Sequence, residues 1–254
     1  MIVRFVACVG LFTLVATPAK AWCSGPIEAI GACKAGLPED IEERDNPDRS
    51  RDLSLSQEKI GTEQWANGDL AGALQSFKKA FAVLDSRARS DPENTELQRG
   101  LSRILNNIAS LQIVTGNREE ARATYNQVFA IEEKLAGAIE KAEVKSYGMA
   151  GRATASAFGN VAWYALLARN SAKALSFASQ ALAITPDEPW VRINLAHAFL
   201  LLDRETEAQA LYEQVAAARS KPFWKQIVAD DFGKLRKAGV THSLMPTIEA
   251  ALDR

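Results

Sequence analysis

Apolar residues recur along this 254-residue chain at helical spacing, in pairs of segments separated by short polar turns. The first pair carries Ile60 and Gly61 in one segment and Ala73, Phe77 and Ala80 in the next. Such spacing places the side chains on a single face of each α-helix. The pattern therefore predicts two amphipathic helices that pack against each other through these faces.

The polar stretch between the two predicted helices has the composition of a tight turn. Gly68 can adopt the left-handed backbone conformation that ends a helix, and Asp69 can cap the helix that follows. In a second pair of segments, Thr115, Gly116 and Asn117 occupy the equivalent place. The chain is thus expected to fold as helical hairpins with short connections.

The hairpin pattern occurs four times. Shifting the sequence by 48 residues places Phe77 on Tyr125, and shifting the later half by 34 residues places Ala174 on Ala208. Repetition at such periods is typical of solenoid proteins. The predicted units span residues 54–87, 102–135, 155–188 and 189–222.

These units resemble tetratricopeptide repeats. Family positions 7, 8, 20, 24 and 27 are filled, unit by unit, by Ile60, Gly61, Ala73, Phe77 and Ala80; Ile108, Ala109, Ala121, Tyr125 and Val128; Val161, Ala162, Ala174, Ala178 and Ala181; and Leu195, Ala196, Ala208, Tyr212 and Val215. Pro186 stands at the closing proline of the third unit, but Gln64 and Gln112 replace a large apolar residue at position 11. The longer spacing of the first two units is similar to the extended repeats of kinesin light chain and related bacterial proteins. The resemblance implies an all-α, right-handed solenoid.

The segments that flank the units are expected to tether and cap the solenoid. Residues 22–52 form an N-terminal segment, and its part from Pro38 to Asp52, rich in acids and arginines, is interpreted as a solvated linker. Residues 223–254 outline two further amphipathic helices. These should cover the apolar end of the stack, as solenoids require.

Residues 1–21 have the pattern of a cleavable signal peptide. A cationic start precedes an apolar run from Phe5 to Ala16, and Ala19–Lys20–Ala21 fits the small-x-small motif of signal peptidase. The run is too short to cross a bilayer, which requires about 20 residues, so an anchor is disfavoured. A lipoprotein signal is disfavoured because Trp22, not a small residue, precedes Cys23. We expect cleavage between Ala21 and Trp22, a periplasmic or secreted location, and no stable membrane insertion.

Composition, charge and cysteines narrow the class of protein further. Hydrophobic residues make up 47% and charged residues 24% of the chain, as in soluble globular proteins. Loss of the signal removes Arg4 and Lys20 and takes the net charge from −1 to −3, which disfavours nucleic-acid binding.

Two cysteines, Cys23 and Cys33, remain after loss of the signal. An even number of cysteines in an exported chain suggests a disulfide, which would contribute about 2–3 kcal/mol of stability. Two free thiols are the alternative; a metal pair is disfavoured, since no His or further Cys lies near.

The resemblance also implies a ligand surface, because the first helices of tetratricopeptide repeats line a concave groove. Position 6 of each unit, on this side, holds Lys59, Asn107, Asn160 and Asn194. Similar asparagines in kinesin light chain and its relatives grip a peptide backbone, since an amide both donates and accepts hydrogen bonds. Alternatively, the asparagines bond only to adjacent helices and the aromatic residues are core packing. The predicted groove residues are Lys59, Arg103, Asn106, Asn107, Ser110, Asn160, Trp163, Trp190, Asn194 and His197.

No catalytic constellation is evident in the sequence. The histidines are His197 and His242, and no phosphate-binding loop, metal-ligand spacing or nucleophile-elbow motif is present. We therefore expect no cofactor, no metal and no catalytic residue.

Two functions remain open on the sequence. The first is an exported interaction module that binds a peptide or partner protein in the groove. The second is an exported enzyme, or enzyme subunit, with a site between the repeats and the C-terminal helices. An enzyme requires a closed pocket with converging carboxylates, or His197 beside an acid. A third possibility is a helical spacer whose groove is filled by the chain's own termini.

Overall fold

The computed structural model describes residues 47–217 and 221–252, and within these ranges every regular element is a helix. The all-α fold is thereby confirmed. The predicted signal peptide, Cys23 and Cys33 lie outside the described residues. The helices are α3 (Pro47–Ala66), α4 (Leu70–Ser90), α5 (Thr95–Val114), α6 (Arg118–Tyr147), α7 (Arg152–Leu167), α8 (Ser171–Ile184), α9 (Pro189–Leu200), α10 (Glu205–Ala216), α11 (Lys221–Lys237) and α12 (Met245–Leu252).

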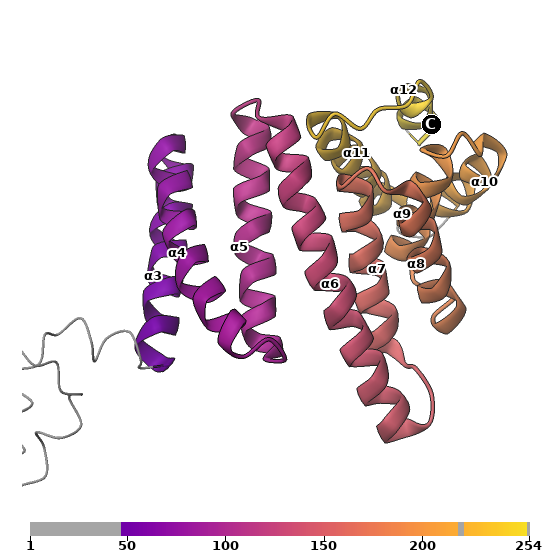
Figure 1. The fold of residues 1–254 in the computed structure, drawn as a ribbon. Coiled ribbons are helices and arrows are strands. Elements are labelled where there is room, and N and C mark those ends of the chain that lie inside the picture. Colours follow the sequence, from indigo (N-terminus) through magenta and orange to yellow (C-terminus); the bar gives the residue numbers. More distant parts are fainter. Residues whose placement is uncertain (1–46, 218–220, 253–254) are drawn as a thin grey trace, which may run out of the picture. The chain divides into compact units, whose positions relative to one another are not determined.

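Consecutive helices form hairpins that lie side by side in chain order (Figure 1). The pairs are α3–α4, α5–α6, α7–α8 and α9–α10, and we call the first helix of each pair its A helix and the second its B helix. The fifteenth residue of every predicted unit has positive φ: Gly68 (82°), Gly116 (83°), Arg169 (61°) and Asp203 (56°). This left-handed residue ends the A helix, so all four hairpins turn at the same register.

The predicted turn chemistry is present in the first hairpin and incomplete in the second. The side chain of Asp69 accepts a hydrogen bond of 2.9 Å from the backbone N–H of Gly72 and so caps α4. Asn117 occupies the equivalent place before α6 but makes no side-chain capping bond. The second turn therefore depends on the positive φ of Gly116 and on backbone hydrogen bonds.

The interface between A and B helices is built from small and aromatic side chains at the predicted positions. Phe77 of α4 is fully buried against Gly61 of α3, where an added Cβ would lie 2.7 Å from the Phe77 ring. The alanines at position 20 are at most 1% exposed: Ala73, Ala121, Ala174 and Ala208. Close helix packing requires such small residues, so burial confirms the predicted core register.

The two glutamines that depart from the family pattern at position 11 are both hydrogen-bonded. Gln64 Oε1 accepts from Ser76 Oγ at 2.7 Å, and Gln112 Oε1 accepts from Thr124 Oγ1 at 2.9 Å. Both hydroxyls stand at position 23 of their units. An A-to-B hydrogen bond thus replaces the usual apolar contact in the first two repeats, and the side-chain oxygen of each of these glutamines is paired.

The predicted linker ends earlier than expected. Helix α3 begins at Pro47, so residues 47–52 are helical, and the interpretation of 38–52 as a linker is wrong for this part. Proline is favourable in the first turn of a helix, because its missing N–H needs no partner there. Ser54, two residues beyond Asp52, is already buried and donates to the carbonyl oxygen of Ala80.

Helix α6 is 30 residues long and extends past its neighbours in Figure 1. Gly148, with φ of 75°, ends it in the left-handed conformation. Glu143 of α6 then accepts hydrogen bonds from the N–H groups of Gly151 and Thr154 and from the Thr154 hydroxyl, at 2.8, 3.0 and 2.6 Å. The α6–α7 connection is therefore held in one conformation.

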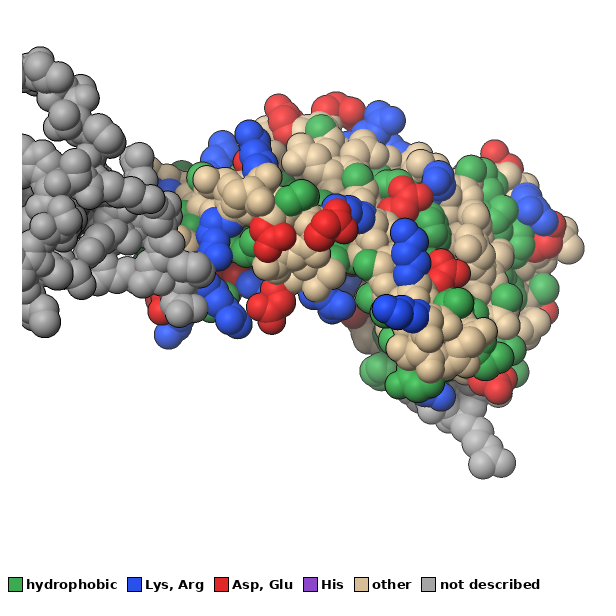
Figure 2. All heavy atoms as spheres, turned by 60° about the horizontal axis from the view of Figure 1, so that its bottom comes forward, with side chains coloured by type: hydrophobic (Ala, Val, Ile, Leu, Met, Phe, Trp, Pro, Cys, Tyr) green, Lys and Arg blue, Asp and Glu red, His purple; other side chains and the backbone are tan. Residues whose placement is uncertain are grey.

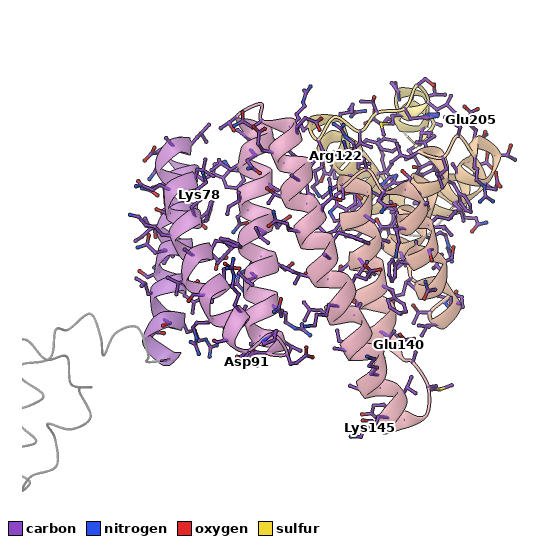
Figure 3. All side chains as sticks on the ribbon, viewed as in Figure 1. Lys78, Asp91, Arg122, Glu140, Lys145 and Glu205 are labelled. Carbon is purple, nitrogen blue, oxygen red and sulfur yellow. The ribbon has the colours of Figure 1, made fainter. Side chains whose placement is uncertain are left out.

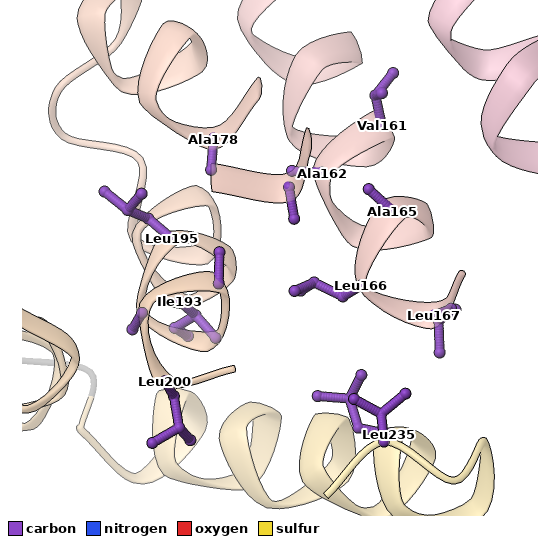
Figure 4. Close-up of a cluster of buried hydrophobic side chains, with 14 of the residues drawn as sticks. Val161, Ala162, Ala165, Leu166, Leu167, Ala178, Ile193, Leu195, Leu200 and Leu235 are labelled. Atoms are coloured by element: carbon purple, nitrogen blue, oxygen red, sulfur yellow. The ribbon is translucent and has the colours of Figure 1, made fainter. Parts of the chain in front are cut away.

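Helix α11 packs across the A helices of the third and fourth repeats. Its Leu235 is fully buried and lies near Leu166 and Leu167 of α7 (Figure 4), and Leu200 of α9 belongs to the same buried cluster. Arg169, at the end of α7, donates to the carbonyl oxygen of Ala238 at 3.2 Å. The C-terminal helices therefore do more than cap the stack, because they cover part of its A-helix side.

In the part of the chain that the structure describes, no helix combines the length and apolarity needed to span a bilayer. On the face drawn in Figure 2, positive and negative side chains are interspersed. This distribution agrees with the near-neutral net charge.

Candidate functional site

The candidate site is the side of the A helices that carries positions 2, 6 and 9, which we call the inner face. Its residues differ widely in exposure. Those on α3, α5 and the middle of α7 reach solvent, whereas Trp163 of α7 and His197 of α9 lie beneath α11. The inner face therefore has an open part, formed by the first three repeats, and a covered part.

A carboxylate organises the open part of the inner face. Glu58 of α3, whose side chain is 14% exposed, accepts from Nε and Nη2 of Arg103 at 2.7 and 2.8 Å. Asn107 of α5 donates to the same carboxylate at 3.5 Å. The hydrogen bond with Glu58 raises the pKa of Arg103. The Arg103 side chain is still 51% exposed, so a fixed guanidinium faces solvent.

Three further predicted residues belong to the open part. Lys59 and Asn160 are exposed and Asn106 is half-buried. Within the described residues, the amide of Asn160 has no hydrogen-bond partner. Asn160 thus retains both donors and its acceptor for an external ligand.

Ser110, at position 9, contacts its own B helix instead of the open surface. Its Oγ lies 3.3 Å from the hydroxyl of Tyr125, which stands at position 24. Burial raises the pKa of Tyr125. This pair has a counterpart at the same two positions of the fourth repeat.

Asn194 is not available to a ligand, contrary to the sequence prediction. It is 4% exposed, and its Nδ2 donates to the carbonyl oxygen of Gly159 on α7 at 3.0 Å. Asn107 likewise reaches position 5 of the preceding A helix, at Glu58. Two of the three asparagines therefore join neighbouring A helices, because the close packing of A helices brings position 6 of one repeat against position 5 of the previous one.

His197 is also not part of an open groove, contrary to the sequence prediction. It is fully buried, with Nδ1 2.6 Å from the Tyr212 hydroxyl and its ring centroid 5.0 Å from that of Phe232. Its Nε2 lies 3.6 Å from Oδ2 of Asp231 and has no hydrogen-bond partner among the described residues. Both Phe232 and Asp231 belong to α11, so α11 seals this position.

The two predicted tryptophans are half-buried packing residues. Trp163 lies under Lys234 of α11, whose Nζ is 5.5 Å from the ring centroid. Trp190 packs on Gly159, where an added Cβ would be 2.3 Å from the indole. Both aromatic side chains therefore pack against the protein itself.

The sequence analysis did not single out Glu58, Asp231 and Phe232. These residues determine the contacts of the predicted groove residues, since Glu58 binds Arg103 and Asn107, and Asp231 and Phe232 lie against His197. Glu58 was detectable in principle, since an acid at position 5 and an arginine at position 2 of the next repeat are complementary. The partners on α11 carried no such signal. An amphipathic pattern predicts that a helix packs, and not which surface it packs on.

The enzyme alternative finds little support in the geometry. His197 does lie beside an acid, but both the ring and its Nε2 are sealed from solvent. A pocket of about 190 Å³ between α10 and α12 is lined mainly by apolar side chains, with Glu205 and Glu213 at its edge. No group of three or more potential metal ligands occurs within the described ranges.

Two family models match the chain. Both describe the tetratricopeptide repeat, one over residues 102–135 and the other over residues 160–230. The first range coincides with the second predicted unit, and the second runs from α7 into α11. No curated protein matches the sequence.

Solved structures give weaker similarity. Two crystal structures of a putative kinesin light chain from Podosopora anserina with nearly identical TPR-like repeats, one of them a substituted variant, align at 16% and 17% identity. They cover 80% and 82% of this chain and 93% and 97% of theirs, with TM-scores of 0.47 and 0.46. Pseudomonas aeruginosa pilF aligns at 15% identity over 80% of this chain and 90% of its own, with a TM-score of 0.28. The family assignment rests on the two sequence models.

Proposed function

Because the chain belongs to the tetratricopeptide-repeat family, we propose that it is an interaction scaffold that binds an extended segment of a partner protein on the open part of its inner face. The observation that carries this proposal is the exposed, unpartnered amide of Asn160 on the same face as Arg103 and Lys59. These groups are polar, accessible and held on rigid helices. The proposed partner is a protein, and the proposed activity is binding without catalysis.

The chemistry of the open part favours a particular kind of segment. The Asn160 amide can pair with both the N–H and the C=O of an extended backbone, whatever the side chain. Arg103 is oriented by Glu58 and presents its remaining donors to solvent, with Lys59 on the neighbouring helix. Two cations beside an amide suit a segment that carries a carboxylate. We infer an extended stretch with at least one acidic residue.

Affinity capture of partner proteins from the cell-envelope fraction tests binding. Three forms of the protein serve as the immobilised bait. The double variant Arg103→Ala with Asn160→Ala should lose at least one partner that the unchanged protein captures. The matched control is Gln75→Ala with Lys79→Ala, two exposed residues of α4 outside the inner face. Circular dichroism establishes that all forms are folded. Identical partner sets for the three forms would refute binding at the inner face.

We also propose that this function is carried out outside the cytoplasm. The basis is the signal-like pattern of residues 1–21. N-terminal sequencing of the protein from fractionated cells should find Trp22 as the first residue in the periplasmic or secreted fraction. Recovery of uncleaved protein in the cytoplasm would contradict export without affecting the inner-face proposal.

A further inference from the structure

The end of helix α6 carries three exposed apolar side chains, which we call the apolar tip. Tyr147 is 80% exposed, Met149 is 68% exposed and Val144 is 45% exposed. The hydrogen bonds from Gly151 and Thr154 to Glu143 hold the tip in place. An aromatic and a thioether side chain presented together on a rigid support are typical anchors of protein interfaces.

The apolar tip is flanked by basic residues. Lys141 and Lys145 are exposed on the last turns of α6. The side chain of Arg152, after the turn, is 83% exposed and forms an ion pair of 3.4 Å with Glu188. Of the nearby acids, Glu143 is engaged in capping α7. A complementary surface should therefore be apolar with a negative edge.

A surface of this kind exists near the C-terminus of the same chain. The pocket between α10 and α12, here called the C-terminal pocket, has a volume of about 190 Å³. Its apolar lining includes Leu200, Ala208, Ile248 and Leu252. Glu205, Gln209 and Glu213, spaced one helical turn apart on α10, form a polar edge with two carboxylates.

The size of the pocket suits an aromatic ring. A dry apolar cavity of roughly 150 Å³ in another protein accepts a benzene molecule. A phenol ring therefore fits the C-terminal pocket, and its hydroxyl would meet the polar edge, as buried tyrosines require. Lys141 and Lys145 would then approach Glu205 and Glu213.

We propose that copies of this chain associate head to tail, with the apolar tip of one copy inserted into the C-terminal pocket of the next. Lys145 and Glu205 mark the two surfaces; in Figure 3 Lys145 lies at the bottom of the view, at the tip of α6, and Glu205 lies at the upper right, so the tip and the pocket are on separate parts of one copy. Such a contact between two different surfaces is heterologous and leaves a free tip and a free pocket at the ends of each assembly. Association should therefore proceed beyond dimers.

Sedimentation velocity over a dilution series from micromolar to millimolar protein tests the proposal. The purified chain should show a concentration-dependent increase in mass, reduced at high salt because the charged edges are screened. Tyr147→Ser should weaken association about tenfold or more, since it removes the anchor. Val114→Ser is the matched control, because Val114 is 53% exposed on α5 outside both surfaces, and it should leave association unchanged.

A mixing experiment separates this contact from other modes of association. Thr247→Trp, at an exposed residue of the pocket lining, should block the pocket without disturbing the tip. At a protein concentration where each variant alone is monomeric, an equimolar mixture of Tyr147→Ser and Thr247→Trp should form dimers and nothing larger. A monomeric unchanged protein, unaltered association of either variant, or a mixture without dimers would overturn the proposal.

Discussion

Asn194 Nδ2 donates a 3.0 Å hydrogen bond to the carbonyl oxygen of Gly159 and so ties α9 to α7. In sequence, Asn194 is indistinguishable from Asn160, since both precede an apolar residue and an alanine at the same repeat position. In the structure one is 4% exposed and the other is exposed to solvent. The same amide thus has a structural role in one repeat and remains free in another.

Replacing Asn194 should therefore cost stability, whereas replacing Asn160 should not. Asn194→Ala removes a buried hydrogen bond and should lower the free energy of unfolding by about 1–2 kcal/mol. Asn160→Ala is the control and should change it by less than about 0.5 kcal/mol. Urea denaturation measures both. Equal effects of the two substitutions would contradict the distinction between a structural and a free amide.

Two glycines on neighbouring helices should respond to alanine in opposite directions. Gly159→Ala would place a Cβ 2.3 Å from the indole of Trp190 and 3.0 Å from Val191, so overpacking should destabilise by about 1–3 kcal/mol. Gly137→Ala in α6 meets no atom within 4 Å and should stabilise by about 0.5–1 kcal/mol, because alanine is the better helix former. Thermal unfolding of both variants provides the measurement, and a neutral Gly159→Ala would show that Trp190 moves freely.

The attachment of α11 to the inner face should depend on one phenylalanine. Phe232 is fully buried, and Phe232→Ala should destabilise the protein by about 3–5 kcal/mol through the lost transfer energy and the cavity. Phe223→Ala on the same helix is the control, because Phe223 is 60% exposed and should tolerate truncation.

The readout for α11 is the solvent accessibility of tryptophan, since Trp163 lies beneath this helix. Fluorescence quenching by a soluble quencher should increase in Phe232→Ala under native conditions. Unchanged quenching together with unchanged stability would show that α11 does not cover the inner face in solution.

Alkaline pH should destabilise the protein through its buried tyrosines. Burial, and then the charge of Glu132, raise the pKa of Tyr164 to about 12, and the pKa values of Tyr125 and Tyr212 are raised in the same direction. Because the pKa is raised in the folded state, folding favours the neutral phenol. The contribution of the tyrosine to the free energy of unfolding is therefore fully present below about pH 10 and is lost as the pH rises from there through about 12. For Tyr164, the difference between the folded-state pKa of about 12 and the ordinary value of about 10 corresponds to roughly 2–3 kcal/mol of stability.

Urea denaturation at about pH 9 and about pH 11 measures this loss. Tyr164→Phe cannot ionise and should lose less stability between the two pH values than the unchanged protein. Part of the loss should persist, since Tyr125 and Tyr212 still titrate. An identical loss in the variant would exclude Tyr164 as a contributor.

Much of the helical architecture was predictable because it is encoded locally. Gly68 and Gly116 mark turns through their backbone freedom, and the small residues Gly61 and Ala73 recur at the spacing that close helix packing needs. Even Arg169 and Asp203, which carry no turn signal, adopt the left-handed conformation that the repeat register requires. The turn positions of the third and fourth hairpins therefore followed from the period alone.

The sequence by itself determined the hairpins, their register and which residues stand at position 6 or 9 of each unit, because these follow from helical spacing and turn chemistry along the chain. Only the tertiary structure decided which of those residues meet solvent. Asn160 and Asn194 occupy equivalent positions, but Asn160 is exposed and Asn194 is bonded to Gly159. Ser110 and His197 both lie against the tyrosine of their own B helix, but only His197 also contacts Phe232 of α11. Whether α11 lies over them depends on packing between segments far apart in sequence, and no local pattern records that choice.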